Sequence, residues 1–405
     1  MHVPLLPGVQ AQKGSTTTEM TLGVMGGGQL GRMFVHAAQR MGFFTAVLDP
    51  DAQSPAGRVS HHHVPSGYTD ANGLQQLALA CSAITTEFEN VPAEALAQLA
   101  LSRTVSPPAH AVAIAQDRAQ EKAHFVRCGV ACAPYAVIET AEQLASVADH
   151  LLPGILKTAR MGYDGKGQKR VTTRAELTAA WEQLQHAPCV LEKMLPLQLE
   201  CSVIVARGAD GACVHLPVQR NLHRDGILAV TEVYDGAVPE PLARRAIAAA
   251  LSIAEGLQYV GVLCVEFFVL HAEAAKSQGL PDLVVNEMAP RPHNSGHYSM
   301  DACDVSQFEL QVRTLAQLPL TQPRLHSPAV MLNLLGDIWP DGGVPAWDKV
   351  LALPGTHLHL YGKAKAAKGR KMGHLTVTGS SVDAVCATAA QAARILGLPD
   401  DFAGI

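Results

Sequence analysis

The sequence predicts an α/β protein in which an N-terminal domain with an open parallel sheet is followed by an α+β part that carries a lid subdomain. Three observations predict this architecture. A strand, a glycine turn and a helix at residues 21–41 begin an alternation of strands and helices that ends near residue 115. A glycine-rich turn then joins two short strands between residues 154 and 172, and two apolar strands near residues 262–285 each carry or precede one acid. With 405 residues, the chain is also too long for a single core.

Composition restricts the function classes. Apolar residues make up 48% of the chain and the mean hydropathy is +0.12, yet no apolar run reaches the roughly 18 residues of a membrane span. A formal charge of −5 argues against a general nucleic-acid binder. The nine cysteines are scattered singly, which favours reduced packing residues. We therefore expect a cytoplasmic protein with no membrane and no nucleic-acid partner. Its residues 1–19 form an extension that we expect to be disordered, because no periodic segment precedes Met20.

The glycines of the first turn match a nucleotide-binding pattern only weakly. Gly26, Gly28 and Gly31 fit G-x-G-x-x-G, and Asp49 closes the next strand where a ribose-binding acid would lie. The same glycines suit any tight turn that presents a helix N-terminus to an anion. A nicotinamide-dependent oxidoreductase is therefore one open alternative.

A second acidic segment follows the strand at residues 82–88. Glu87 and Glu89 lie where the strand's carboxyl end would be, which is where open sheets bind ligands. The alternative is that they are charges at a helix N-terminus, and we favour this alternative slightly.

The turn at residues 158–168 resembles a lid over a polyphosphate. It lies between two strands. Lys157 and Lys169 flank the turn, Lys166 lies within it, and its glycines permit many backbone conformations. The chain contains no G-x-x-x-x-G-K-[ST] sequence, so it is not a P-loop enzyme. A plain hairpin with a mobile tip is the alternative.

Two carboxylates are candidates for a magnesium site. Glu266 is the one charge in the apolar run from Val262 to Leu270, and Glu287 follows the apolar run that starts at Leu283. If the two runs pair as a hairpin, both carboxylates approach on one face and can share Mg²⁺ through oxygen ligands. A structural salt bridge at Glu266 is the alternative.

Two clusters of donors suit a phosphate or carboxylate. The first follows Glu287 directly and the second is a basic run in an otherwise acidic protein. Each has a plainer explanation, as an ordinary solvated loop or as solvated surface. The first cluster contains Arg291, His293, Asn294, Ser295 and His297, and the second contains Lys363, Lys365, Lys368, Arg370 and Lys371.

Five motifs in one order make the chain resemble the ATP-grasp ligases, and among them the 5-(carboxyamino)imidazole ribonucleotide synthases of purine biosynthesis. The motifs are GGGQLGRM at 26–33, GYDGKGQ at 162–168, NLHRDGIL at 221–228, NEMAPRPHNSGH at 286–297 and GRKMGHL at 369–375. The resemblance spans residues 20 to about 380. It implies a Rossmann-like domain at 20–115, an ATP-grasp lid subdomain at 116–195 and an ATP-grasp C-terminal domain with a basic tail region at 196–405.

The resemblance also implies site residues. Glu266 and Glu287 match the metal ligands, and Asp164, Arg291 and Lys363 match catalytic positions. The residues that match the ATP site are Arg118, Lys157, Gly162, Tyr163, Asp164, Gly165, Lys166, Gly167, Gln168, Glu192, Lys193, Met194, Leu195, Glu200, His223, Asn286 and Glu287. Those that match the acceptor site are Gln29, Leu30, Arg291, His293, Asn294, Ser295, Lys363, Arg370 and Lys371.

The implied reaction joins bicarbonate to the amine of 5-aminoimidazole ribonucleotide at the expense of ATP, through carboxyphosphate. Such chemistry needs positioning and charge neutralisation rather than a protein nucleophile. The expected cofactors are ATP and Mg²⁺, with Mn²⁺ as a substitute, and the expected assembly is a homodimer. A formate-using glycinamide ribonucleotide ligase and a catalytically silent nucleotide-binding subunit remain alternatives.

Overall fold

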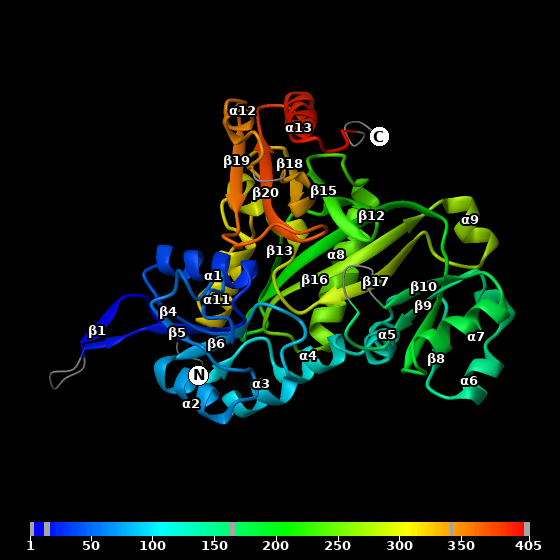
Figure 1. Cartoon of the computed structure of the whole chain (residues 1–405), viewed down its shortest axis with the longest axis horizontal. Coiled ribbons are helices and arrows are strands. Elements are labelled where there is room, and N and C mark those ends of the chain that lie inside the picture. Colours follow the sequence, from blue (N-terminus) through cyan, green and yellow to red (C-terminus); the bar gives the residue numbers. More distant parts are fainter. Residues whose placement is uncertain (1–3, 12–16, 163–166, 341–342, 401–405) are drawn as a thin grey trace.

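The protein consists of three sheets with flanking helices and one short hairpin (Figure 1). The structure is a computed structural model that describes residues 4–11, 17–162, 167–340 and 343–400. The predicted mixed α/β class is confirmed, because a parallel sheet comes first and antiparallel sheets follow. No helix of these ranges is long and apolar enough to cross a membrane.

The first sheet is parallel, with the strand order β5-β4-β3-β6-β7. All five residues of β3 are buried, because helices cover both faces of such a sheet. Its strands are β3 (Thr21–Met25), β4 (Phe44–Leu48), β5 (His62–Val64), β6 (Ala83–Thr86) and β7 (Thr104–Val105), and its helices are α1 (Gln29–Arg40), α2 (Ala71–Ala80), α3 (Ala93–Ala100) and α4 (Ala109–Ala115).

The second sheet lies in the segment predicted to form the lid, and it projects from the body at the lower right of Figure 1. It is antiparallel, with the order β10-β9-β11-β8, and its core is built around Leu156, Leu191 and Trp181. The elements are β8 (Tyr135–Ile138), α6 (Ala141–Ser146), the 3-10 turn η1 (Asp149–Leu151), β9 (Gly154–Thr158), β10 (Gln168–Val171), α7 (Arg174–Gln183) and β11 (Cys189–Lys193).

The third sheet has nine strands in the order β17-β16-β12-β14-β15-β18-β20-β19, with β13 paired to β12. The C-terminal strands therefore extend the sheet that contains the two acidic strands rather than forming a sheet of their own. Its strands are β12 (Leu197–Arg207), β13 (Cys213–His215), β14 (Gln219–Arg224), β15 (Ile227–Val233), β16 (Gly261–Leu270), β17 (Leu283–Ala289), β18 (Ala329–Leu335), β19 (Thr356–Leu360) and β20 (Lys371–Thr378).

Helices cover this large sheet and join it to the other parts. The alanine-rich α8 places Ala246, Ala250 and Ile253 against the sheet, as expected for an amphipathic helix. The remaining elements are α5 (Arg118–Arg127), α8 (Glu240–Gly256), α9 (Ala272–Ser277), η2 (Asn294–Gly296), α10 (Ser299–Ala302), α11 (Gln307–Leu315), η3 (Gly336–Ile338), α12 (Trp347–Leu351) and α13 (Val382–Leu396).

Helix α11 is buried on nearly every side, because it lies between the first and third sheets. It contacts α1 and β6 on one side and β12 and β16 on the other. The side-chain amide of Gln311 donates to the Thr85 hydroxyl at 3.1 Å and to the Thr86 carbonyl at 3.2 Å. This helix fixes the N-terminal domain against the sheet that carries the two acidic strands.

The N-terminal extension differs from the expected disorder. β1 (Val9–Ala11) pairs with β2 (Thr17–Glu19) as an antiparallel hairpin. The backbone N–H of Leu5 donates to the Ala316 carbonyl at 2.8 Å, and the Leu5 side chain packs against the core of the first domain. Hydrophobic contact by one leucine supplies the order that the polar composition did not predict.

Candidate active site

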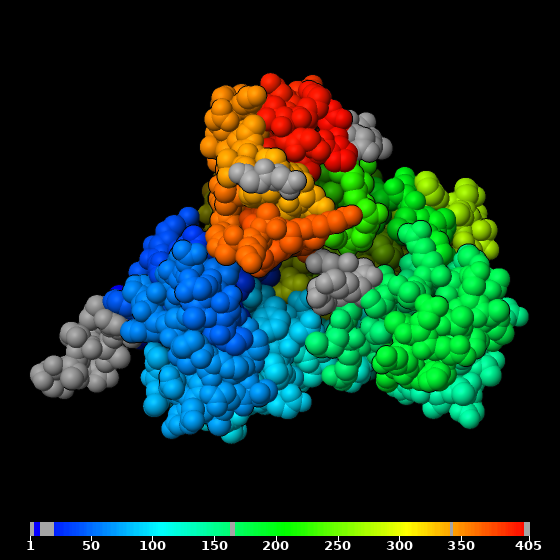
Figure 2. Space-filling model, viewed as in Figure 1, coloured from blue at the N-terminus to red at the C-terminus, as the bar shows by residue number. Residues whose placement is uncertain are grey.

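A cleft of about 560 Å³ lies where the first domain, the two acidic strands and the C-terminal strands meet. Figure 2 shows a recess between these parts, beside the lid. Segments separated by more than 300 residues contribute to its wall, so only the fold brings them together. Its polar lining includes Gln29, Glu87, Glu89, Arg118, Glu266, Glu287, Arg291, His293, Asn294, His297, Lys363, Lys368, Arg370 and Lys371.

The two acidic strands pair as the sequence predicts. β16 and β17 are antiparallel, and their register shifts between the pairs Val265↔Met288 and Phe267↔Val285. The single residue Glu266 consequently faces two residues, Asn286 and Glu287, at this irregularity. The connection between the strands contains the helix α9.

The surroundings of Glu266 fit a divalent cation. Burial raises its pKa to about 7, and the negative charges of Glu287 and Glu200 act in the same direction against the opposing charge of His223. The buried side-chain oxygen of Asn286 has no hydrogen-bond partner in the described part of the chain. Crowded carboxylates beside an unused amide oxygen form the oxygen-rich donor set that Mg²⁺ prefers.

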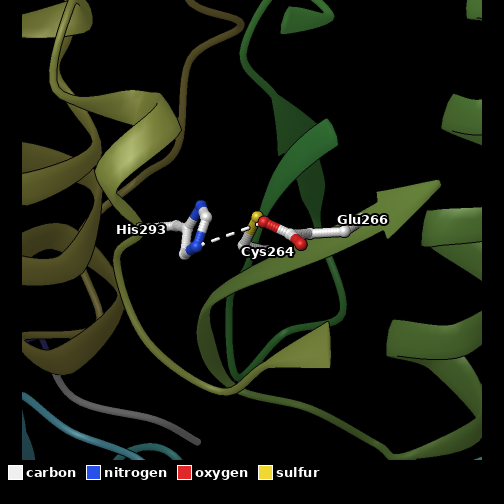
Figure 3. A group of neighbouring side chains, drawn as sticks. All are labelled: Cys264, Glu266 and His293. Carbon is white, nitrogen blue, oxygen red and sulfur yellow. Dashed lines mark ion pairs between the residues drawn. The ribbon is translucent and has the colours of Figure 1, made fainter. Parts of the chain in front are cut away.

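Each of the two acids has a close side-chain contact. Glu287 forms an ion pair with Arg118 at 3.0 Å, and Glu266 lies 3.3 Å from Nε2 of His293. Figure 3 shows His293 and Glu266 facing each other, with the buried Cys264 beside them. These three side chains offer ligand atoms within 4.8 Å of one another.

Helix α5 supplies three residues to the floor of the site. Besides Arg118, it carries Glu121, whose carboxylate accepts the Met288 backbone N–H at 2.7 Å, and Lys122, which reaches the Asn286 carbonyl at 3.4 Å. Burial raises the pKa of Glu121 to about 8, although the charges of Arg118 and Lys122 oppose this shift. Of these three residues, only Arg118 is among the site residues predicted from the sequence. Both missed residues lie within one turn of it, and their contacts come from a strand 160 residues away.

A buried charge triad joins α5 to the lid. Glu192 on β11 lies 3.2 Å from the ammonium group of Lys122 and 3.1 Å from that of Lys157 on β9. All three side chains are at most 8% exposed. The carboxylate between two lysines therefore ties strands β9 and β11 to helix α5. Two members of this triad, Lys157 and Glu192, are among the predicted nucleotide residues.

Glu200 and His223 contact each other across β12 and β14, but they line a different space. This smaller cavity, of about 230 Å³, is shared with Arg220, Asn221 and Glu232. Burial alone would lower the pKa of His223. The hydrogen bond to Glu200 and the charges of Glu266, Glu200 and Glu287 outweigh it and raise the pKa. The structure therefore divides the predicted nucleotide residues between the central cleft and this cavity.

Further predicted nucleotide residues lie at the two described ends of the glycine-rich turn. Gly162 lines the cleft, and Gly167 has a positive φ of 73° just before Gln168 begins β10. Tyr163, Asp164, Gly165 and Lys166 lie outside the described residues.

The end of β11 and the connection to β12 carry three further predicted nucleotide residues. Lys193 and Met194 donate their backbone N–H groups to the carbonyls of Pro134 and Pro153, and Leu195 packs against a small core beneath β16.

The glycine turn of the first domain binds the protein's own carboxylates. The N–H groups of Gly28 and Gly31 donate to Glu87 at 2.8 and 3.1 Å, and that of Gly27 donates to Asp49 at 2.7 Å. Glu87 is thus a charge at the N-terminus of α1, and the favoured alternative predicts such a role. Glu87 reaches that helix from the end of β6, the strand beside β3. Asp49 holds the turn, so its predicted resemblance to a ribose-binding acid is wrong.

Some residues of the loop after β17 line the cleft and others do not. Arg291 pairs with Glu89 of the first domain and lines the cleft. Asn294 also lines it, and both polar atoms of this buried amide have no hydrogen-bond partner within the described ranges. Ser295 is fully buried; its hydroxyl contacts Ser202 and the His293 ring, both at 2.9 Å. Ser295 therefore positions His293 instead of lining the cleft.

The basic run forms the opposite rim, in the loop between β19 and β20. Lys363 donates to the Lys371 carbonyl at 2.7 Å, and Gly369 donates to Asp337 at 2.7 Å. Lys363, Lys368, Arg370 and Lys371 all line the cleft, so this run is part of the site rather than plain surface. Lys365 is the member of the predicted basic cluster that does not line the cleft.

Comparisons with known proteins match this chain along most of its length. Residues 19–116 match a ribonucleotide synthetase preATP-grasp domain, residues 123–308 an ATP-grasp domain, and residues 329–388 a phosphoribosylaminoimidazole carboxylase C-terminal domain. An N5-carboxyaminoimidazole ribonucleotide synthase from Brucella melitensis is 42% identical over 88% of this chain and 95% of its own length. The chain belongs to the N5-carboxyaminoimidazole ribonucleotide synthase family.

Another relative and two solved structures of the synthase family are also similar to this chain. The synthase from Bacillus subtilis is 38% identical over 88% of this chain and 90% of its own length. An ADP complex of an N5-carboxyaminoimidazole ribonucleotide synthetase has a TM-score of 0.87 at 36% identity, covering 98% of this chain and 99% of its own. The Aspergillus clavatus synthase in complex with ADP and 5-aminoimidazole ribonucleotide has a TM-score of 0.84 at 30% identity, covering 94% and 99%.

Membership of the synthase family decides between the alternatives left by the sequence. The nicotinamide-dependent oxidoreductase rested on the glycine pattern and Asp49. Here Asp49 accepts the N–H of Gly27, and the pattern glycines Gly28 and Gly31 donate to Glu87. The formate-using ligase is set aside because the matched relatives are N5-carboxyaminoimidazole ribonucleotide synthases. The chain is an ATP-grasp ligase.

Proposed function

We propose that this protein carboxylates 5-aminoimidazole ribonucleotide with bicarbonate and ATP, giving 5-(carboxyamino)imidazole ribonucleotide, ADP and phosphate in purine biosynthesis. The observation that supports this most is the composition of the single cleft. One wall carries carboxylates suited to a nucleotide-bound metal, and the opposite rim carries four basic side chains suited to a ribonucleotide phosphate.

The proposed reaction has two steps. Bicarbonate oxygen attacks the γ-phosphorus of ATP, the bond to ADP breaks, and carboxyphosphate forms. The exocyclic amine of the ribonucleotide then attacks the carboxyl carbon, phosphate leaves, and the amine loses a proton. Both steps gather negative charge in one place, which the cationic side chains around the cleft can neutralise without forming a covalent bond to substrate.

We assign Glu266 and Glu287, with the Asn286 oxygen beside them, to the binding of Mg²⁺ or Mn²⁺. When bound, the ion would neutralise charge on the transferring phosphoryl group. Arg118 would turn from Glu287 toward phosphate oxygens as that ion enters, because it lines the same cleft. Lys157, Gly162–Gln168, Glu192–Leu195, Glu200 and His223 remain our proposed nucleotide contacts.

We assign the acceptor to the space between Gln29 and the loop after β17. The unpartnered amide of Asn294 offers both a donor and an acceptor there, and the neutral His293 ring faces the acids. Burial, followed by the charges of Arg291 and Lys371, keeps the pKa of His293 well below its usual range. Arg291, Lys363, Arg370 and Lys371 would hold the phosphate, and Arg291 and Lys363 with Asp164 would serve the carboxyl transfer.

The test is phosphate release by the purified protein with ATP, Mg²⁺ and bicarbonate, with and without 5-aminoimidazole ribonucleotide. We expect release that depends on both bicarbonate and the ribonucleotide. Release with glycinamide ribonucleotide and formate instead would support the other ligase class. No release under any condition would identify a catalytically silent subunit.

We also propose a homodimer in the cytoplasm. All nine cysteines are free thiols, which suits a reducing compartment. Sedimentation velocity at several protein concentrations tests the dimer, and a single monomeric species throughout would contradict it.

A further inference from the structure

Four metal-binding side chains meet on the C-terminal strands, outside the cleft. β19 and β20 are antiparallel, with His359 directly opposite His374. His357 precedes His359 by two residues and so lies on the same face of β19. Asp301 reaches this face from α10, which contacts β20. Three separate segments thus bring three imidazoles and one carboxylate together.

The distances are close to those of a coordination shell. One Asp301 oxygen lies 2.9 Å from Nε2 of His359, and the other lies 3.8 Å from Nδ1 of His357. Asp301, His359 and His374 offer ligand atoms that all lie within 4.8 Å of one another. Ligands at about 2.0–2.1 Å from a tetrahedral ion stand roughly 3.3 Å apart, so the distance between Asp301 and His359 needs to lengthen by only about half an ångström.

A second observation that points to a bound ion is a ring nitrogen of His374. Its side chain is completely buried, and its Nε2 has no hydrogen-bond partner among the residues that the structure describes. Its Nδ1 lies 3.0 Å from the Tyr361 hydroxyl. Metal-binding histidines typically use one ring nitrogen for the ion and the other for such an outer contact.

We propose that Asp301, His357, His359 and His374 bind a transition-metal cation of the Zn²⁺ type. Imidazole nitrogens with one carboxylate suit zinc and its neighbours, whereas Mg²⁺ prefers an all-oxygen shell. His357 is 40% exposed and His374 is buried, so the ion has an entry path from solvent and a dry inner side.

The site is distinct from the cleft but adjoins it. The ring of His374 lies 4.7 Å, centroid to centroid, from that of His297, which lines the cleft. A bound ion would clamp β19 to β20 and to α10. The loop between these two strands carries the basic rim, so the ion would fix the base of that loop.

The test is zinc binding by the resting protein, without ATP or ribonucleotide, so its outcome does not depend on the proposed function. The protein is dialysed against a chelator and titrated with Zn²⁺ in excess Mg²⁺, and the bound metal is counted. We expect one tightly bound Zn²⁺ per chain and a higher unfolding temperature with zinc than with chelator. Co²⁺ in its place should give the visible absorption of a four-coordinate ion.

Variants locate the ion. His359→Gln and Asp301→Asn should each weaken binding by more than about 100-fold, and Tyr361→Phe, which removes only the outer contact, by about 10- to 100-fold. His215→Gln on β13 is the matched histidine control and should bind normally. Cys264→Ala tests the other candidate cluster, in the cleft, and should also leave binding unchanged.

Three results would overturn the proposal. They are absence of stoichiometric zinc in the unsubstituted protein, equal affinity in His359→Gln and Asp301→Asn, and loss of zinc in Cys264→Ala alone. The first would make the cluster an ion pair with stacked rings and nothing more. If His359→Gln fails to fold in chelator, Asp301→Asn, which keeps the side-chain shape, decides the matter.

Discussion

Replacing Glu192 with glutamine tests the buried charge triad that holds the lid to the floor of the cleft. The carboxylate lies 3.2 Å from Lys122 and 3.1 Å from Lys157, and none of the three side chains is more than 8% exposed. Glutamine keeps the shape and removes the charge. Two buried ammonium groups then lose the carboxylate that contacts both of them.

We expect Glu192→Gln to lower the free energy of unfolding by about 3–5 kcal/mol near pH 7, the usual cost of removing one partner of a buried pair. In the unsubstituted protein, burial lowers the pKa of Lys122, and the charges of Glu192 and Glu121, with the hydrogen bond to Glu192, together more than reverse this. Burial lowers the pKa of Lys157, and Glu192 opposes that shift. Without Glu192, both lysines should have depressed pKa values in the folded state.

These pKa values determine how the free energy of unfolding of the variant changes with pH. Lysines with a depressed pKa bind fewer protons in the folded state than in the unfolded chain, where the pKa is about 10.4. Stability of the variant should therefore rise with pH, and its deficit should shrink between pH 7 and pH 9 by up to about 1.4 kcal/mol per unit for each lysine.

Urea unfolding of both proteins at pH 7, 8 and 9 measures this deficit. The control is Glu240→Gln, because Glu240 and Arg244 form an exposed pair on α8 and such pairs contribute about 0–1 kcal/mol. A deficit below about 1 kcal/mol, or one that does not change with pH, would refute the reasoning.

Three further predictions concern the cleft. Glu287→Gln should abolish ATP-dependent phosphate release while circular dichroism stays unchanged, because one of two proposed Mg²⁺ ligands is lost; near-normal turnover at saturating Mg²⁺ would contradict the metal assignment. Lys371→Ala should raise the KM for the ribonucleotide roughly tenfold with little change for ATP, and Arg291→Ala should do the same and also lower kcat; weakened ATP binding alone would show that these residues serve the nucleotide. Glu121→Gln should gain stability relative to the unsubstituted protein as pH rises from about 5 to 8, by up to about 1.4 kcal/mol per unit, because a carboxyl whose folded pKa is about 8 resists the ionisation that the unfolded chain allows. Urea midpoints across this range check the last prediction, and a constant difference would count against it.

The sequence was sufficient wherever the signal was local. The apolar runs around Glu266 and before Glu287 predicted two strands, and their short connection predicted an antiparallel pair, which the structure has. The glycine turn after β3 likewise predicted a helix N-terminus. Periodicity and turn residues act over a few positions, so a single sequence carries them in full.

The sequence was insufficient where a residue's partner lies far along the chain. Local patterns gave Glu87 and Asp49 as ligand-site candidates, and only the sheet order shows that both bind the turn at Gly27–Gly31. The same holds for Lys122, an unremarkable helix residue until β11 brings Glu192 to it.

The sequence by itself determined the family of this protein, its two acidic strands, its lid and its basic run, because five motifs and their order are properties of the chain. Only the tertiary structure decided which of these residues share a space. It joined the basic run to the acids in one cleft, moved Glu200 and His223 to a separate cavity, and buried Ser295 beneath His293. The reason is physical: contacts within a cleft depend on how sheets pack and which strands are neighbours. Burial and strand order are set by the whole chain at once, and no short segment encodes them.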